Sequence, residues 1–236
     1  MSVNTTYRSN APEIMDNFQM EGEILRDALD KIARINQLLG GNKVTLQGVK
    51  SLIDNQPKTD QIRIIDIGCG NGDMLRTLAD YAKKIDLNFT LLGIDANNFT
   101  VEHARKLSAG YANISYECAD IFEQFDQPVA TDIVLCTLTL HHFKEEEIIL
   151  LLRHYSHARL GIVINDLERS AIAYYLFKAL CFVFGLNDMS REDGLVSILR
   201  GFKRADLLLY SKKLNFKNYI ITWKWAFRYQ WIVKTV

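Results

Sequence analysis

The chain has 236 residues, of which 48% are hydrophobic and 24% charged, and its formal net charge is zero because Lys+Arg and Asp+Glu both number 28. This length suits one α/β domain with a modest cap, and the composition is close to the average for a soluble globular protein. The neutral balance argues against nucleic acid or an anionic membrane as the main partner, because proteins that bind such surfaces usually carry a basic excess.

Cysteine usage and the apolar runs favour a reducing compartment. The four cysteines lie far apart, and no pair has metal-ligand spacing: Cys69, Cys118, Cys136 and Cys181. We therefore expect buried thiols rather than a disulfide framework.

Residues 1–10 lack the apolar stretch of a signal peptide, and the longest apolar run, Ala171–Leu186, is too short to span a membrane and contains Lys178. The sequence predicts a cytoplasmic protein without a membrane span.

Residues 1–58 are predicted to form a helical extension or cap. Apolar residues at helical spacing run from Pro12 to Leu39, and the Gly40-Gly41 pair ends that pattern. A short helix over Leu46–Asp54 is expected next, and Asn55–Asp60 is expected to be a linker. The pattern changes after it, so residues 59–236 are predicted to form the main domain.

From Arg63 the chain alternates short apolar strands with helices. This alternation predicts parallel strands joined by crossover helices on both faces of one sheet, a doubly wound α/β fold. The expected strands are Arg63–Ile67, Thr90–Ile94, Ile114–Cys118, Thr131–Thr137 and Leu160–Asn165, and the expected helices are Asp73–Lys84, Phe99–Ala109 and Lys144–Ser156.

The region after the fifth strand is too long for a simple connection. Residues 167–199 contain an apolar helix, Ala171–Phe184, and a polar stretch, Asn187–Ser197. We predict a helical insertion close to the active site. A helix over Lys203–Lys213 should follow, and the last two strands of a mostly parallel seven-stranded sheet are then expected at Asn218–Trp225 and Phe227–Val233.

A glycine-rich turn follows the first strand. It contains Gly68, Gly70 and Gly72 in the pattern G-x-G-x-G, whereas a dinucleotide site has G-x-G-x-x-G. Glycines let a ligand approach the backbone, and the N-terminus of the following helix suits an anionic group. Asp66, two residues before the first glycine, would be unfavourable beside a pyrophosphate but suits a cofactor that carries an ammonium group.

Carboxylates also follow the second and third strands. Asp95 lies 25 residues after Gly70, about the distance at which Rossmann-type folds place an acid on a ribose diol. Asp120 could accept a hydrogen bond from an adenine amine, with Ile121 packed on the ring. Because ligands bind at the carboxyl ends of parallel strands, these positions predict one shared site. The alternative is that the glycines merely form a tight turn capped by Asp66.

With its D-x-G-C-G-x-G motif and the acid that closes the second strand, the chain from about Arg63 onward resembles the class I S-adenosylmethionine-dependent methyltransferases. The resemblance implies S-adenosyl-L-methionine as cofactor and a seven-stranded sheet that ends in an antiparallel hairpin. By this resemblance the cofactor-binding residues are Asp66, Gly68, Cys69, Gly70, Asp95, Ala96, Asp120, Ile121 and Cys136.

The fourth strand leads into two histidines. His141 and His142 follow it, and in the family this loop lines the methyl-transfer centre. Either imidazole could accept a phenol or enol proton, because its ordinary pKa is near 6.5. Asn165 and Asp166 end the fifth strand, where catechol-type methyltransferases bind magnesium. The acid that such enzymes also have after strand four is missing here, so we expect no metal.

The apolar insertion and the neutral charge favour a small-molecule substrate. The insertion resembles that of bacterial methyltransferases from polyketide, quinone or aryl-pigment pathways, which implies O-methylation of a phenolic or polyketide-like molecule. Alternatives are C-methylation in quinone biosynthesis, a non-catalytic domain that binds adenosylmethionine or adenosylhomocysteine, and a nicotinamide oxidoreductase. Arg191 and Arg200 are either solvated, paired with Asp193 or used to hold an anionic substrate group. Whether the chain forms a homodimer stays open.

Overall fold

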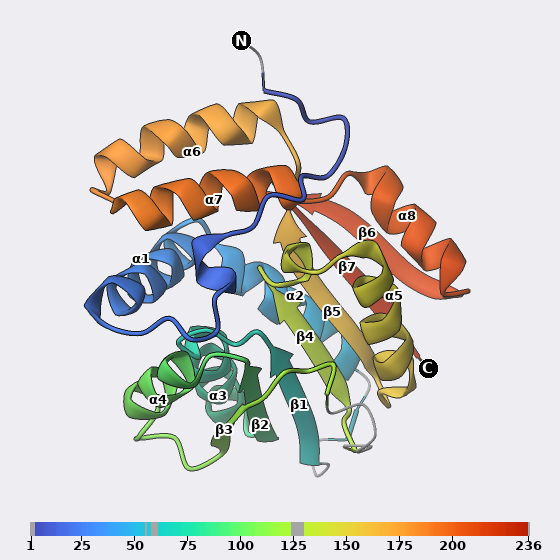
Figure 1. Ribbon diagram of the computed structural model, residues 1–236. Coiled ribbons are helices and arrows are strands. Elements are labelled where there is room, and N and C mark those ends of the chain that lie inside the picture. The colour runs from blue at the N-terminus through green and yellow to red at the C-terminus, as the bar shows by residue number, and fades with distance from the viewer. Residues whose placement is uncertain (1–2, 55, 58–60, 124–129, 236) are drawn as a thin grey trace.

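The fold is organised around one seven-stranded sheet. The computed structural model describes residues 3–54, 56–57, 61–123 and 130–235 (Figure 1). The strands lie in the order β3-β2-β1-β4-β5-β7-β6. Their bounds are β1 Gln61–Ile67, β2 Asn88–Asp95, β3 Ile114–Cys118, β4 Ile133–Thr137, β5 Gly161–Leu167, β6 Asn218–Lys224 and β7 Arg228–Lys234. The predicted doubly wound α/β fold is confirmed.

Strands β1 to β5 are parallel, and β7 runs antiparallel to both β5 and β6. This is the antiparallel hairpin expected at the end of the sheet. In the register, Ile67 at the end of β1 lies opposite Ile94 on one side and Cys136 on the other. The loops that leave β1, β2 and β4 therefore begin at the same edge of the sheet.

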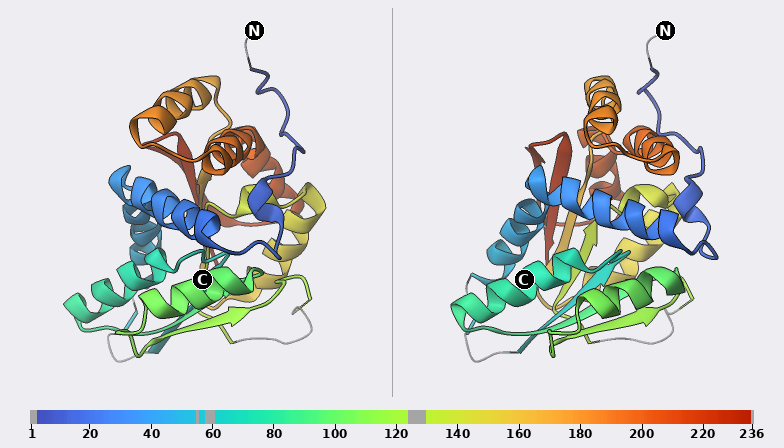
Figure 2. Two further views of the ribbon diagram at one scale, coloured as in Figure 1. Left: turned by 60° about the vertical axis from the view of Figure 1, so that its left-hand side comes forward. Right: turned by 90° about the vertical axis from the view of Figure 1, so that its left-hand side faces the viewer.

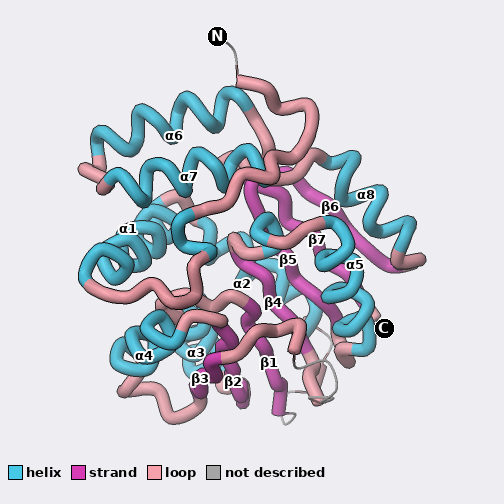
Figure 3. Tube along the Cα trace, viewed as in Figure 1, coloured by secondary structure: helices cyan, strands magenta, loops and turns pink. Residues whose placement is uncertain are grey.

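Helices cover both faces of the sheet (Figure 3). One face packs against α2, α3 and α4, and the other against α5 and α8. Neighbouring residues of β1 face opposite cores, Ile64 toward α3 and Ile65 toward α5, because side chains alternate along a strand. The bounds are α2 Gly41–Ile53, α3 Asp73–Ile85, α4 Asn98–Leu107, α5 Glu145–His154 and α8 Arg204–Lys213, with a 3₁₀ turn, η3, at Tyr155–His157.

The first part of the N-terminal extension lies over the edge of the sheet at which β1, β2 and β4 end. A 3₁₀ turn, η1, spans Ile14–Asp16, and helix α1 spans Glu23–Leu38. In both views of Figure 2, α1 lies between the α3–α4 pair and the insertion. The expected helical pattern from Pro12 is thus interrupted, because Gly22 has φ +99° and α1 begins only after it. Helix α2 starts at Gly41, earlier than predicted. Most of the predicted linker lies outside the described residues.

The insertion after β5 consists of two stacked helices at the top of Figure 1. They are α6 Ala171–Val183 and α7 Asp188–Arg200. The polar stretch at Asn187–Ser197, to which no element was assigned within the predicted helical insertion, is largely helical. Its buried side is mainly polar and includes Asp193 and Arg200, so no apolar periodicity marks it. Within the described part of the chain, no helix has both the length and the apolar character needed to cross a membrane.

Candidate active site

A large cavity opens at the carboxyl ends of β1, β2 and β4. Its volume is about 1340 Å³, and its walls come from the glycine loop, η1, α1, the insertion and a 3₁₀ turn, η2, at Leu140–His142. Pockets for single small ligands usually measure about 300–1,000 Å³. The cavity therefore has room for a cofactor and a second molecule beside it.

The glycine loop after β1 faces this cavity. Gly68 and Gly70 have φ +66° and +53°, in the left-handed region that favours glycine. A Cβ on Gly70 would meet no described atom within 4 Å, whereas a Cβ on Gly68 would lie 2.3 Å from the Thr139 side chain. Gly68 is thus required by packing against the loop after β4. Gly70 leaves free space next to the backbone, as a bound ligand needs.

Asp66 lies below the loop with an unpartnered carboxylate oxygen. The residue is 2% exposed, and its Oδ1 has no hydrogen-bond partner among the described residues. Burial raises the pKa of this carboxyl well above its ordinary value, and the charges of Asp73 and Asp95 raise it further. A buried carboxylate without a donor is costly, so the site favours a ligand that supplies N–H groups or positive charge.

The acid that ends β2 and the acid that follows β3 line the same cavity. The Asp95 carboxylate accepts hydrogen bonds from the backbone N–H of Gly70 and of Asn97, both at 3.1 Å. Burial raises the pKa of Asp95, while these two hydrogen bonds oppose the rise. Asp120 accepts from the backbone N–H of Phe122 at 2.9 Å and lines the cavity together with Ile121.

The structure brings most of the predicted cofactor residues together at this cavity: Asp66, Gly68, Cys69, Gly70, Asp95, Ala96, Asp120 and Ile121 all line it. Cys136 is different. It is fully buried in β4 within the core that faces α5, and the next residue, Thr137, reaches the cavity in its place. A direct role for Cys136 in cofactor binding stays a prediction.

His141 makes two hydrogen bonds with Asp166. Its Nδ1 lies 2.6 Å from Asp166 Oδ1, and its backbone N–H donates to Asp166 Oδ2 at 3.1 Å. Burial opposes ionisation of Asp166, but the pairing with His141 and further backbone hydrogen bonds hold the pKa of this carboxyl below its ordinary value. Since a carboxylate only accepts, Nδ1 carries a hydrogen. In the neutral imidazole, Nε2 then has a free lone pair, and no described residue is bonded to it.

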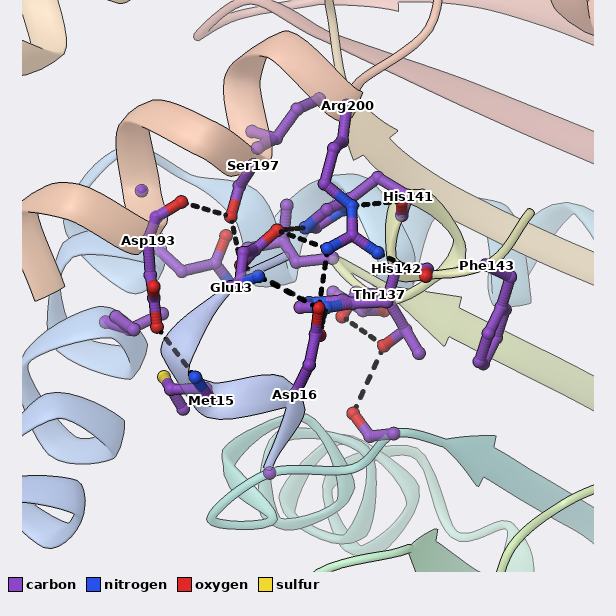
Figure 4. A pocket seen from close by; sticks show the side chains of 18 of the residues that line it. Glu13, Met15, Asp16, Thr137, His141, His142, Phe143, Asp193, Ser197 and Arg200 are labelled. Atoms are coloured by element: carbon purple, nitrogen blue, oxygen red, sulfur yellow. Dashed lines mark hydrogen bonds and ion pairs between the residues drawn. The ribbon is translucent and has the colours of Figure 1, made fainter. Parts of the chain in front are cut away.

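The second histidine has the same arrangement with an acid of the N-terminal extension. His142 Nδ1 lies 2.7 Å from Asp16 Oδ1. Burial opposes ionisation of Asp16, yet hydrogen bonds with His142, Arg200 and the backbone lower the pKa of its carboxyl well below the ordinary value. Figure 4 shows both imidazoles directed toward Glu13.

Glu13 lies between the two histidines and α7. Its carboxylate is 3.8 Å from His141 Nε2 and 3.9 Å from His142 Nε2, and it accepts a hydrogen bond from Ser197 Oγ at 2.7 Å. Burial raises the pKa of Glu13 to about 6, although His142, Ser197 and Arg200 act in the opposite direction. The N-terminal extension thus contributes a polar wall of the cavity.

Two arginines of α7 have different surroundings. Arg191 pairs with Asp188 on the surface at 3.0 Å. Arg200 pairs with Asp16 at 2.6 Å and donates to the carbonyl oxygens of His141 and His142. Asp193, which was one expected partner of these arginines, instead accepts the backbone N–H groups of Ile14 and Met15.

The sequence did not point to Glu13 or Asp16. They lie in the extension, more than 120 residues from the histidines, and neither belongs to a motif. The one local signal is a capping box, in which the Asp16 carboxylate accepts the backbone N–H of Glu13. That pattern predicts a turn and gives no information on what the turn contacts.

Comparison with known proteins decides the family. The family model described as a methyltransferase domain matches residues 58–181, more than half of the chain. The chain belongs to the methyltransferase domain family. This methyltransferase is adenosylmethionine-dependent, so the expected cofactor is confirmed at the level of the family. The orphaned Asp66 oxygen and the open backbone at Gly70 fit such a cofactor, which carries an ammonium group.

One sequence relative and two solved structures of the same fold are similar to this methyltransferase. The ribosomal RNA large subunit methyltransferase G of Shewanella baltica (strain OS155) is 26% identical over 117 residues, 47% of this chain and 29% of the relative. The chain thus spans less than a third of the length of the curated relatives it matches. The plantazolicin methyltransferase BpumL in complex with SAH has a TM-score of 0.65 at 17% identity, covering 87% of this chain and 88% of that one. The CurJ carbon methyltransferase has a TM-score of 0.60 at 13% identity, covering 82% and 54%.

Proposed function

We propose that this methyltransferase transfers the methyl group of S-adenosylmethionine to an oxygen of a small phenolic or polyketide-like molecule. One observation carries the proposal: a single cavity joins the glycine loop to the buried pair of His141 and Asp166. Its wall on the insertion side is mostly apolar and includes Leu176, Phe177 and Leu180 of α6. Such a surface suits an aromatic or aliphatic acceptor.

The cofactor residues take the roles that the family resemblance implies. Asp66 and the glycine loop would hold the methionine end of the cofactor, Asp95 the ribose, and Asp120 with Ile121 the adenine. The bound cofactor supplies a methyl group on a positively charged sulfur. The protein has to orient the acceptor against it and exclude water, which can lower the barrier by several kcal/mol.

The two histidines promote loss of the acceptor's proton. The acceptor oxygen becomes a strong nucleophile only when its O–H bond breaks. Asp166 fixes the His141 ring so that Nε2 keeps its lone pair, and His142 lies next to it with ring centroids 4.3 Å apart. Asp166 is a positioning residue in this scheme.

The neutral charge supports a small-molecule acceptor over RNA, and the free thiols support a reducing compartment. The chain has no excess of basic residues to attract RNA, although the curated relatives are named for ribosomal RNA. The loop after β4 also lacks the Asn/Asp-Pro-Pro motif typical of adenine or amide N-methylation. All four cysteines are free, as in proteins of a reducing compartment such as the cytoplasm.

Incubation with adenosylmethionine and a panel of phenols and β-ketones, followed by mass spectrometry, tests the proposal. We expect products that gain one methyl group at oxygen, recognised by their fragmentation and acid lability. Methylation at carbon would favour the alternative of a C-methyltransferase. Methyl transfer only to RNA or protein, or cofactor retention without any turnover, would contradict the proposal.

Replacement of His141 tests whether this histidine promotes loss of the acceptor's proton. His141→Ala should lower kcat by about 10²–10⁴-fold, because general acid–base assistance has that size, while the cofactor Kd stays within a few-fold. His157→Ala, an exposed histidine far from the cavity in the fold, is the control and should leave both values unchanged. A loss of cofactor affinity without loss of kcat would make His141 a structural residue.

A further inference from the structure

Two imidazoles, the buried His141 and the half-buried His142, present free nitrogens to one carboxylate. Each Nδ1 is engaged by an acid, His141 by Asp166 and His142 by Asp16. Each Nε2 therefore faces inward with a lone pair when the ring is neutral. Both nitrogens converge on Glu13, as Figure 4 shows.

In this arrangement, imidazole nitrogens that can only accept a hydrogen bond face a carboxylate that also only accepts. His141 Nε2 and Glu13 Oε1 are 3.8 Å apart, both are buried, and neither has a hydrogen-bond partner among the described residues. Arg200 Nη1 is 3.6 Å from the same oxygen, too far for a hydrogen bond. Two unpaired acceptors this close repel each other unless a positive charge lies between them.

We propose that Glu13, His141 and His142 form a binding site for a divalent transition metal, with Zn²⁺ as the expected ion. Their ligand atoms all lie within 4.8 Å of one another. A tetrahedral zinc with bonds of about 2.0–2.1 Å needs ligand atoms roughly 3.3–3.5 Å apart. His141 Nε2 is 3.8 Å from Glu13 Oε1, and His142 Nε2 is 3.9 Å from the other oxygen, Oε2. Because all three ligand atoms lie within 4.8 Å of one another, the distances between them need to shorten by at most about 1.5 Å to reach this spacing.

The surroundings of the three ligands match those of metal sites. Histidines that bind metals usually donate their other ring N–H to a carboxylate or carbonyl, which fixes the tautomer and the ring orientation. Here Asp166 and Asp16 do so for the two histidines, and Ser197 fixes the carboxylate of Glu13. The charge of Arg200 is offset by its close contact with Asp16.

The site rests on the proposed function and specifies how the histidines would act in it. Two histidines and one glutamate leave at least one coordination position for an oxygen, as in catalytic zinc sites. An acceptor hydroxyl bound there would lose its proton to water more readily. The oxygen then forms a bond to the methyl carbon while the carbon–sulfur bond breaks, and adenosylhomocysteine leaves.

Metal titration of the full chain, first stripped with a chelator, tests the inference. We expect one Zn²⁺ per chain at micromolar or lower concentration, and a visible absorption band when Co²⁺ replaces it. Glu13→Gln and His142→Ala should each weaken binding by more than about tenfold. Asp16→Asn removes only a supporting contact and should weaken binding by about 10–100-fold.

His103→Ala is the matched control, because His103 also pairs with an acid, Asp30 at 2.8 Å, but outside this cluster. The affinity of His103→Ala for Zn²⁺ should equal that of the wild type. Absence of saturable Zn²⁺ binding, or binding that all three substitutions leave unchanged, would overturn the inference. Glu13→Gln keeps the shape of the side chain. If its thermal unfolding matches that of the wild type, weaker Zn²⁺ binding reflects loss of the site and not loss of the fold. Zn²⁺ binding is measured without an acceptor, so its result is independent of whether the proposed methylation is observed.

Discussion

At the scale of single residues, Gly70 tests the cofactor site most simply. Gly70→Val places a branched side chain into the open space beside the loop, at a φ of +53° that valine avoids. We expect adenosylmethionine binding to be abolished in calorimetric titration. Gly110→Val is the control, because its Cβ also meets no atom and its φ is not in the left-handed region. Unchanged affinity in Gly70→Val would refute the site.

The Asp66 carboxylate should lower the free energy of unfolding of the cofactor-free protein and strengthen adenosylmethionine binding. Because burial and neighbouring acids raise the pKa of its carboxyl, ionisation destabilises the cofactor-free fold as the pH rises above about 4. Asp66→Asn cannot ionise, so its free energy of unfolding should exceed that of the wild type at pH 7 and approach it near pH 4. Chemical denaturation at the two pH values measures this.

The same substitution should weaken adenosylmethionine binding by about 1.5–3 kcal/mol, since a hydrogen bond to a charged group is lost. A variant that gains no stability at pH 7, or that binds the cofactor as tightly as the wild type, would contradict the role of Asp66.

Local motifs predicted that the candidate cofactor residues lie together. Asp66, Gly70 and Asp95 lie at or just after the carboxyl ends of β1 and β2, and parallel strands bring such positions to one edge whatever the details of packing. Glu13 could not be found in this way. Its contact with His141 depends on how the extension folds back over the sheet, which no pattern within residues 1–58 encodes.

At the scale of elements, the contact between η1 and α7 fixes the N-terminal wall of the cavity. The Asp193 carboxylate accepts the backbone N–H groups of Ile14 and Met15 at 2.6 and 2.9 Å. Asp193→Ala leaves both donors unpaired, which should cost about 1–3 kcal/mol locally. Faster hydrogen exchange at residues 13–16 is the expected result.

Asp188→Ala, at an exposed position of the same helix, is the control and should leave exchange at residues 13–16 unchanged. Equal exchange in the two variants would show that Asp193 does not hold η1. Within the predicted helical insertion, no bounds were assigned to α7, because the side that it buries binds polar partners. Hydrophobic periodicity detects helices that pack on an apolar core, as α3 does.

At the scale of the whole molecule, the sheet and its crossover helices were predictable because strands at the centre of the sheet are buried on both faces. β4 and β5 have almost no exposed residues, so they appear in the sequence as short apolar runs. The polar wall of the cavity could not be predicted from apolar runs. It is assembled from η1, η2 and α7, whose contacts are hydrogen bonds between distant segments.

We propose that the glycine loop binds adenosylmethionine. Calorimetric titration of the full chain with S-adenosylmethionine, S-adenosylhomocysteine and NADH tests this assignment. We expect binding of the first two at micromolar concentrations and none of NADH, because Asp66 disfavours a pyrophosphate and the loop lacks the G-x-G-x-x-G spacing. Binding of NADH alone would contradict the role of the loop and every function assigned to the residues around it.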